Sequence, residues 1–406
     1  MNTRYDVVIV GGGMVGATIA CALGNSNLSV AVLEHAYPKA FESDQPNDLR
    51  VSAISVASEN ILKMVGAWEG ILSRRSCPYR RMKVWEADEV KAATEFVSDH
   101  IGHEYLGHIV ENRVIQLALL ERLKAFDNID LICPAKVEEI DYSPGSSLIR
   151  LDDEREIIGR LLIAADGGDS KVRQAAGIGV TKWDYEQFAL VASVTTNYPQ
   201  QDITWQQFTP TGPLAFLPLS GENASLVWYN TPDNVKRLMQ LDDDQFMQEL
   251  TATFPDTLGS LDKLLMRGYF PLRRQHAQEY VLEGLALAGD SAHMINPLAG
   301  QGVNIGLLDA ASLAEVILKA ARTGEDITEL ELLKEYEQQR RQHNLLMMQT
   351  MDAFYRIFSN QIGPLKLIRN IGLGLAERVT PAKNKVTRFA MGLEGPLPAL
   401  ARLEEI

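Results

Sequence analysis

The feature that most constrains this chain is a glycine-rich turn directly after its first hydrophobic run. Tyr5–Val10 is typical of a buried strand, and Gly11-Gly12-Gly13-Met14-Val15-Gly16 follows it. In a strand–turn–helix unit the first glycine allows a tight turn and the second lets backbone N–H groups approach a pyrophosphate. The third lets the helix pack closely on the sheet, with its positive end facing the diphosphate. The pattern predicts a dinucleotide site with contacts at Gly11, Gly13, Val15 and Gly16.

A carboxylate at the end of the next strand sharpens this prediction. The hydrophobic run Ser29–Leu33 ends at Glu34, which lies 18 residues after Gly16. A carboxylate there can accept hydrogen bonds from both ribose hydroxyls, and it would repel a 2′-phosphate. NADP is therefore disfavoured as the ligand of this unit. A glycine-rich turn that binds nothing is the alternative, but it leaves Glu34 and two later segments unexplained.

Two later segments repeat the arrangement of a strand followed by a polar turn. Leu161–Ala165 leads into Asp166-Gly167, and Leu285–Ala288 leads into Gly289-Asp290. Asp290 could bond a ribityl hydroxyl of a flavin. Gly300-Gln301-Gly302 precedes a helical pattern, so its N–H groups would favour negative charge on the pyrimidine side of a reduced flavin. Asp-Gly alone is ordinary turn chemistry, but the three segments in this order predict an FAD site.

These segments resemble the single-component FAD-dependent aromatic hydroxylases, the para-hydroxybenzoate hydroxylase class, over nearly the whole chain. The resemblance rests on the glycine fingerprint, on Asp166-Gly167 with Ser170 and Arg173 behind it, and on Gly289 through Gly302. Within the class, Asp48–Ser55 and His293–Asn304 resemble the ubiquinone-biosynthesis hydroxylases. Thr204–Pro210, Ala224–Tyr229 and Phe358–Asn360 resemble members that hydroxylate 2-polyprenyl-3-methyl-6-methoxy-1,4-benzoquinol.

The resemblance implies further contacts with FAD. Arg50 matches an arginine near the flavin and the substrate, Arg113 and Gln116 lie on a helix approaching the diphosphate, and the Val137 backbone meets the adenine. The full expected set of cofactor contacts is Gly11, Gly13, Val15, Gly16, Glu34, Arg50, Arg113, Gln116, Val137, Asp166, Gly167, Asp290, Pro297, Gly300, Gln301, Gly302 and Asn304.

The resemblance also implies the chemistry. FAD, O₂ and NAD(P)H would hydroxylate the ring of a polyprenyl benzoquinol or phenol through a flavin C4a-hydroperoxide, so the cofactor rather than a side chain carries the catalytic step. The expected substrate wall comprises Trp205, Phe216, Pro218 and Trp228, although each could equally belong to the core of a sheet. The alternatives are an FAD-dependent reductase or dehydrogenase of the same fold, and a non-catalytic flavin-binding scaffold in a biosynthetic complex.

The hydrophobic patterns predict a mixed α/β fold with a discontinuous first domain. We expect a Rossmann-like FAD-binding domain at 1–75, 105–182 and 270–322, and an inserted antiparallel β-sheet substrate domain at 76–104 and 183–269. A C-terminal helical region would cover 323–406. The inserted segments contain alternating runs such as Leu190–Val194 and Ser225–Trp228, and Asp233–Phe254 has a helical pattern.

Charge and cysteine content restrict the partners. A net charge of −14 argues against binding nucleic acid through phosphate contacts. The three cysteines are widely spaced with no metal-ligand pattern, so we expect no metal and a cytoplasmic protein with reduced thiols. Because the basic stretch 363–390 has apolar residues at helical spacing, it is a candidate for peripheral contact with the inner face of a membrane. Packing of that stretch on the flavin domain, with delivery of substrate by a protein complex, is the alternative.

Overall fold

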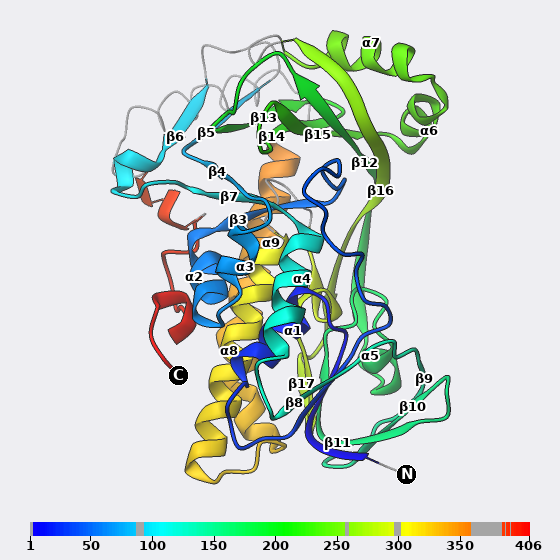
Figure 1. Ribbon diagram of the computed structural model, residues 1–406, viewed down its shortest axis with the longest axis vertical. Helices are drawn as coiled ribbons and strands as arrows, with labels where there is room; N and C mark the ends of the chain where they lie inside the picture. The colour runs from blue at the N-terminus through cyan, green and yellow to red at the C-terminus, as the bar shows by residue number, and fades with distance from the viewer. Residues whose placement is uncertain are drawn as a thin grey trace.

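The structure, a computed structural model, describes residues 3–86, 93–255, 260–295, 302–358, 384–385, 387–389 and 391–406. Its elements form two large sheets, one small sheet and a layer of helices (Figure 1). The long axis of the molecule runs from the sheet that contains the N-terminal strand to the sheet that α6 and α7 cover.

The first large sheet contains the strands that the sequence placed before each polar turn. β1 (Thr3–Val10) pairs in parallel with β2 (Val30–Leu33) and β11 (Glu156–Ala164), and β11 pairs in parallel with β18 (Leu285–Leu287). Parallel strands end at the same edge of a sheet, so the turns after β1, β11 and β18 converge. The remaining strands are β8 (Ile129–Ile132), β9 (Val137–Asp141), β10 (Ser147–Leu151) and β17 (Val281–Leu282).

Helices cover this sheet. α1 (Met14–Ala22) packs against α4 (Asn112–Leu123) and α8 (Gly302–Thr323), and α8 lies alongside α9 (Leu330–Phe358) (Figure 1). Their apolar side chains join those of the strands in one large core. Three shorter helices complete the described helices of this part: α2 (Val56–Met64), α3 (Trp68–Leu72) and α5 (Lys171–Ala175).

The second large sheet is mostly antiparallel, with a parallel pair between β13 and β5. Its order is β19-β16-β12-β15-β14-β13-β5-β6. The strands are β5 (Arg81–Glu86), β6 (Thr94–Val97), β12 (Val180–Thr196), β13 (Ile203–Thr209), β14 (Gly212–Pro218), β15 (Asn223–Asn230), β16 (Leu261–Ala277) and β19 (His293–Met294).

The helical prediction for Asp233–Phe254 is met by two helices rather than one. α6 (Pro232–Gln240) and α7 (Asp243–Thr253) are separated because Asp242 caps the second helix. Its side chain accepts a hydrogen bond from the backbone N–H of Gln245, and the Gln245 side chain bonds back to Asp242. The two helices cover one face of the second sheet, which leaves its other face toward the rest of the molecule (Figure 1).

The strands β12 and β16 connect the two ends of the molecule. Each has 17 residues, and they pair along nearly their whole lengths. The boundaries expected at 182/183 and 269/270 therefore fall inside continuous strands.

A small sheet of β3 (Val51–Ser55), β7 (Gly107–Glu111) and β4 (Cys77–Tyr79) lies beside the large ones.

Candidate active site

A cavity of about 350 Å³ lies where the converging turns of the first sheet face the second sheet. This volume is within the usual range for small-molecule sites. One side is formed by the turns, including Gly13, Gly167 and Asp290, and the other by β-strand side chains such as Val191 and Val227. The cavity therefore joins the predicted cofactor segments to the predicted substrate sheet.

The glycines of the first turn differ in why a larger residue is absent from each position. Gly11 has φ +104°, and a Cβ there would lie 2.3 Å from the carbonyl oxygen of Ala165. A Cβ on Gly16 would lie 2.0 Å from the carbonyl oxygen of Gly11, so helix α1 could not pack as it does. Gly13 instead has ordinary extended backbone, and its Cβ would meet nothing within 4 Å. Gly11 and Gly16 are thus required by the fold, whereas Gly13 leaves open space in the cavity.

Side chains from two other elements hold this turn. Glu34 Oε2 accepts a hydrogen bond of 2.7 Å from the Gly12 N–H, and Gln116 Nε2 donates one of 3.0 Å to the Gly12 carbonyl oxygen. Glu34 therefore lies beside the turn, as its position at the strand end predicted. Its oxygens retain lone pairs that could accept further bonds.

The second turn carries an unpaired carboxylate oxygen. Asp166 Oδ2 accepts hydrogen bonds from the N–H groups of Lys171 and Val172, at 2.7 and 3.2 Å, and so caps α5. Asp166 Oδ1 is buried and has no partner among the described residues. Gly167 has φ +84°, and a Cβ there would meet nothing within 4 Å. This turn therefore has both an unsatisfied hydrogen-bond acceptor, on Asp166, and open space, beside Gly167.

Two residues expected near the cofactor make other contacts. Arg113 donates two hydrogen bonds to Asp48, at 2.8 and 2.9 Å, and others to the carbonyl oxygens of Lys39 and Ala40. Most of its N–H groups therefore clamp the loop before β3 rather than face the cavity. The Val137 carbonyl oxygen accepts a 2.7 Å hydrogen bond from Lys171 Nζ, and neither Arg113 nor Val137 lines the cavity.

Asp290 and Arg50 both line the cavity. Asp290 is exposed toward the cavity, but the surrounding protein raises the pKa of its carboxyl group by removing bulk water, while the charges of His293 and Arg50 oppose that rise. The Arg50 guanidinium lies 5.8 Å from the centre of the Phe270 ring. A cation and a carboxylate thus face the same space from opposite segments.

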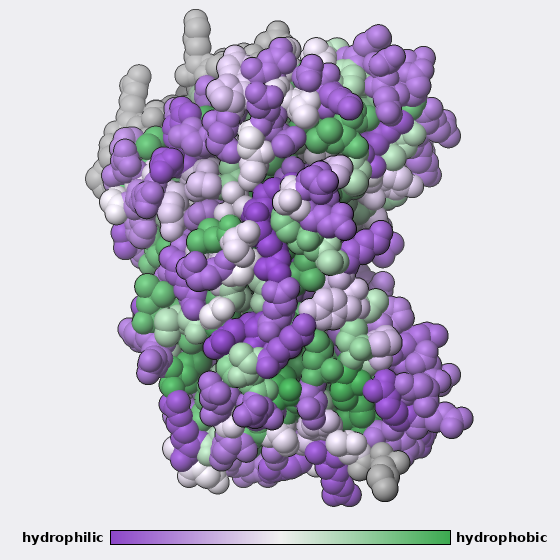
Figure 2. Space-filling view, in the orientation of Figure 1, coloured by the Kyte–Doolittle hydropathy of each residue, from purple (hydrophilic) through white to green (hydrophobic). Residues whose placement is uncertain are grey.

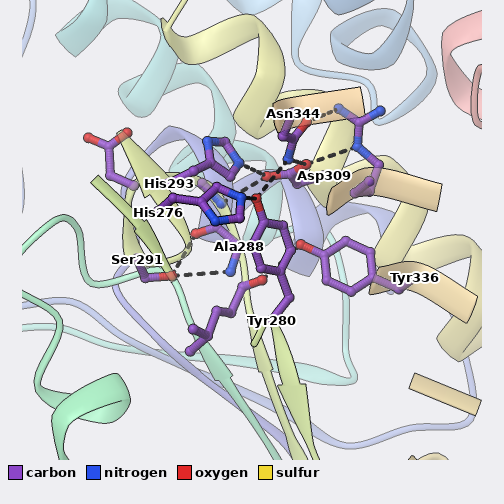
Figure 3. A network of polar contacts seen from close by, with 12 residues as sticks. His276, Tyr280, Ala288, Ser291, His293, Asp309, Tyr336 and Asn344 are labelled. Atoms are coloured by element: carbon purple, nitrogen blue, oxygen red, sulfur yellow. Dashed lines mark hydrogen bonds and ion pairs between the residues drawn. The ribbon is translucent and has the colours of Figure 1, made fainter. Parts of the chain in front are cut away.

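A buried polar network supports the third turn from behind (Figure 3). Asp309 of α8 is 0% exposed, and its Oδ2 accepts a 3.2 Å hydrogen bond from the N–H of Gly289 and contacts His293 Nε2. Its Oδ1 accepts hydrogen bonds from Arg340 Nε at 2.9 Å and from Asn344 Nδ2 at 3.0 Å. The carboxylate therefore joins the Gly289-Asp290 turn to both long helices.

The surrounding groups determine the charge of this network. Burial alone would raise the pKa of Asp309, but contacts with His293, Arg340 and Asn344 hold it well below its ordinary value. Burial, assisted by the charge of His293, lowers the pKa of His276 to about 4. Asp309 is therefore ionised and His276 neutral at pH 7. The sequence analysis identified none of Asp309, Arg340 and Asn344 as supports of this turn.

The four residues expected to form the substrate wall, three aromatic residues and one proline, do not line the cavity. Trp205, Phe216 and Trp228 belong to the core beneath α6 and α7, where each is at most 7% exposed. Trp205 is directly opposite Phe216, and Pro218 is two residues further along the same strand, on the same face. None of the four lines the cavity, so the prediction of a wall built from them is wrong for this structure.

The alternate residues of the same strands form the wall instead. Gln206 is opposite Ala215, Ala215 is opposite Val227, and Val227 is opposite Val191. All four line the cavity. Strand periodicity could have identified this second set, because successive residues point to opposite faces. The described residues of the second sheet that line the cavity are Val191, Gln206, Pro213, Ala215, Leu217, Ser225, Val227, Tyr229, Phe270, Pro271, Leu272, Arg273 and Met294.

Three expected cofactor contacts, Pro297, Gly300 and Gln301, lie outside the described residues. Gly302 begins α8 and lines the cavity, and a Cβ there would meet nothing within 4 Å. Asn304 has a structural role: its Nδ2 donates to the carbonyl oxygen of Ala53 at 2.8 Å, and its Oδ1 accepts from the N–H of Ser55 at 3.0 Å. It fastens the start of α8 to β3.

These observations fit FAD. The cavity has open space beside Gly13, Gly167 and Gly302, the carboxylate of Asp290 in its lining, and the start of α1 at its edge. The unpaired Asp166 oxygen is buried beside Gly167 and is not part of the lining. Anionic phosphates suit a helix N-terminus, and hydroxyl groups suit the carboxylates. Within the part of the chain that the structure describes, no group of His, Cys, Asp or Glu side chains could hold a metal ion.

Comparisons with known proteins agree with this geometry. A family model described as an FAD binding domain matches residues 4–351. The chain is 42% identical over 392 residues to the 3-demethoxyubiquinol 3-hydroxylase of Escherichia coli (strain K12), covering 97% of this chain and 100% of that protein. It is 38% identical over 387 residues to the ubiquinone hydroxylase UbiL of Rhodospirillum rubrum, covering 95% and 89% respectively.

A solved structure shares the fold. The p-nitrophenol 4-monooxygenase PnpA from Pseudomonas putida DLL-E4 superposes with a TM-score of 0.80, covering 98% of this chain and 100% of that one. Its sequence is 19% identical to this chain, so the similarity is one of architecture. The mixed α/β architecture expected from the sequence is confirmed.

Proposed function

The chain belongs to the FAD-binding-domain family, and on that premise we propose that it hydroxylates the ring of a polyprenylated benzoquinol or phenol in ubiquinone biosynthesis. It is an FAD-dependent aromatic-ring monooxygenase. The observation that carries the proposal is the cavity itself, which joins three turns suited to FAD to a largely apolar sheet wall. The substrate class is supported by a relative named 3-demethoxyubiquinol 3-hydroxylase, which matches along its full length.

We propose that the turns hold FAD from one side of the cavity. Gly13 and the start of α1 would receive the diphosphate, Glu34 the adenosine ribose, and Asp290 the ribityl chain. Bound FAD would supply the chemistry of ring hydroxylation, with NAD(P)H as the source of electrons and O₂ as the source of the oxygen atom. Arg113 and Gln116 would act indirectly, because their hydrogen bonds hold the surrounding loop and the glycine-rich turn. Val137 would contribute only through its backbone.

The chain's own residues would orient the ring and exclude water. Val191, Leu217 and Val227 offer no hydrogen bonds from their side chains, so they favour an apolar ring over water in the same space. The Asp309 network would keep the Gly289-Asp290 turn in place while the substrate enters. Because both sides are held by regular elements, cofactor and ring would meet in a fixed geometry.

The proposal is tested by assaying purified, FAD-loaded protein with NADH or NADPH, O₂ and a short-chain benzoquinol or phenol. We expect both cosubstrates to be consumed in step with a product 16 mass units heavier, a difference set by the added oxygen atom. Substrate reduction without O₂ consumption would indicate the reductase alternative. No turnover of any of these compounds would favour a scaffold and contradict the proposal.

We also propose that the hydrophobic, polyprenylated substrate reaches the enzyme at a membrane surface or through a protein complex. No described helix is long and apolar enough to cross a bilayer. Figure 2 shows hydrophilic residues over most of one face, with hydrophobic residues in small groups between them. Most of the basic stretch 363–390 lies outside the described residues; of the described part, Arg388 pairs with Glu394 at 3.2 Å.

Flotation with anionic liposomes distinguishes the two routes. We compare the wild type with Lys383→Glu/Lys385→Glu/Arg388→Glu. Binding at low salt that disappears in the variant would support membrane contact through this stretch, since basic residues near an anionic surface contribute about 1 kcal/mol each. Equal flotation, or none for either protein, would favour delivery by partner proteins.

A further inference from the structure

Two buried, uncharged polar side chains interrupt the apolar sheet wall of the cavity. Gln206 and Ser225 both line it, and they are 8% and 1% exposed. Tyr229 also lines it, with its ring packed in a small core cluster. Of the other described wall residues, Arg273 of β16 is charged and exposed, and the rest are apolar. Burying polar groups in such a wall is unfavourable unless a partner satisfies them.

The Ser225 hydroxyl has no such partner among the described residues. Its Oγ is buried and makes no hydrogen bond with any of them. An unsatisfied buried hydroxyl is unfavourable, and native structures contain few of them. A ligand oxygen in the cavity would supply the missing partner.

The two side chains approach the same space from different strands. Gln206 is on β13, opposite Ala215 of β14, and Ser225 is on β15, opposite Leu217 of β14. They are therefore diagonal to each other, with β14 between them. Ala215 and Leu217 have no polar side-chain atoms, so the wall offers two separated polar points with an apolar strip between them.

We infer that Gln206 and Ser225 are specificity-determining residues that hydrogen-bond two oxygen substituents of the substrate ring. This inference rests on the proposed function, because it assumes an aromatic ring in the cavity. The Ser225 hydroxyl and the Gln206 amide can each donate to a methoxy or hydroxyl oxygen. The ring carbons between those oxygens would lie on the apolar strip of β14. The substrate class is thus an oxygen-substituted ring rather than any apolar ring of similar shape.

A neighbouring serine offers a matched control. Ser193 of β12 is directly opposite Ser225 and is also 1% exposed, with a buried Oγ that no described group satisfies. Ser193 does not line the cavity. Replacing either serine with alanine removes the same unsatisfied hydroxyl, so the two variants should resemble each other in stability. Only the change at Ser225 should alter recognition of the ring.

The test measures binding rather than turnover. FAD-loaded wild type, Gln206→Leu, Ser225→Ala, Gln206→Leu/Ser225→Ala and Ser193→Ala are titrated with 2-methoxyphenol and with 2-ethylphenol, and the perturbed flavin absorbance reports binding. The two probes have similar shape and differ by one oxygen. We expect the wild type and Ser193→Ala to prefer 2-methoxyphenol by roughly tenfold, the effect of one well-formed hydrogen bond.

Each single change at Gln206 or Ser225 should weaken binding of 2-methoxyphenol by roughly threefold or more, and the double variant should lose the preference. A wild type that binds both probes equally would overturn this inference but leave the proposed function standing. Unchanged binding in both single variants would overturn it as well. If neither probe perturbs the flavin of any protein, the aromatic substrate of the proposed function fails together with the inference.

Discussion

The two sides of the cavity are built in different ways. On the side of the turns, backbone groups and small residues face the cavity together with Asp290 and Arg50, and a buried charged network supports the third turn from behind. On the sheet side, side chains themselves form the surface, and their alternation decides which residues face the cavity and which face α6 and α7. The first construction suits a constant ligand such as FAD, and the second suits selection among similar rings.

Substitutions on the two sides of the cavity should therefore have different effects. A change on the side of the turns should alter cofactor affinity or the stability of the support. A change on the sheet should alter ring recognition if the residue faces the cavity, and stability alone if it faces the helices. Four substitutions test this separation.

The largest effect on FAD affinity is expected from Gly13→Val. Gly13 has φ −68° and ψ −175°, so valine fits the backbone, and its Cβ would enter open space. FAD affinity should fall by roughly a hundredfold or more, equivalent to about 2.7 kcal/mol, because the side chain occupies the space of the diphosphate. Equilibrium dialysis measures the affinity, and unfolding of the FAD-free protein serves as the control. Full FAD content in the variant would remove this turn from the cofactor site.

Asp309→Ala tests the support behind the turn. Arg340 is 1% exposed and would be left as an uncompensated buried charge, which costs about 3–5 kcal/mol of unfolding free energy. Urea denaturation measures the loss. Glu249→Ala is the matched control, because its pair with Arg237 is exposed and contributes roughly 0–1 kcal/mol. Similar losses in the two variants would show that the network contributes no more than a surface pair.

Trp205→Leu tests the helix-covered face of the sheet. The Trp205 ring packs against Trp85, Phe216 and Phe254 beneath α6 and α7. The smaller side chain should reduce the unfolding free energy by about 1–3 kcal/mol, as measured by urea denaturation. FAD affinity and the preference for 2-methoxyphenol should stay within about twofold of the wild type, since single-site effects on distant groups are usually independent. A lost preference would place Trp205 functionally on the cavity.

The smallest effect is expected from Glu34→Ala. The substitution removes an acceptor of the Gly12 N–H and the proposed acceptor of ribose hydroxyls. FAD affinity should fall by roughly tenfold, about 1.4 kcal/mol, with the fold intact. Glu34→Gln retains one oxygen acceptor and should lose less, and fluorescence titration compares the two. If alanine leaves the affinity unchanged, Glu34 serves the turn alone.

Local patterns explain why the side of the turns could be predicted from the sequence. The tight turn after the first buried strand requires two glycines, Gly11 and Gly16, which lie within a few residues of each other. Glu34 follows at the end of the next strand. The parallel register then brings Asp166 and Asp290 to the same edge. These signals are carried by neighbours in the chain, so they remain visible before folding.

The sheet wall could not be predicted in the same way. Both faces of the second sheet are buried, one under helices and one against the cavity, so hydrophobicity does not distinguish them. The prediction of a substrate wall chose large aromatic residues. Because successive side chains of a strand point to opposite faces, a shift of one residue moves such a prediction to the other face of the sheet. Asp309 is a lone carboxylate in an apolar stretch of α8, which is a usable signal, whereas its partner Arg340 lies 31 positions away on another helix.

In the proposed function, the two sides of the cavity together allow one oxygen atom of O₂ to be added to a ring held against the sheet. Turnover of a short-chain benzoquinol under ¹⁸O₂ with FAD-loaded protein and NAD(P)H, followed by mass spectrometry of the product, tests this directly. We expect one ¹⁸O atom per hydroxylated ring, and none when Gly13→Val replaces the wild type. A hydroxylated product whose new oxygen comes from water, or consumption of O₂ without any ring product, would contradict it.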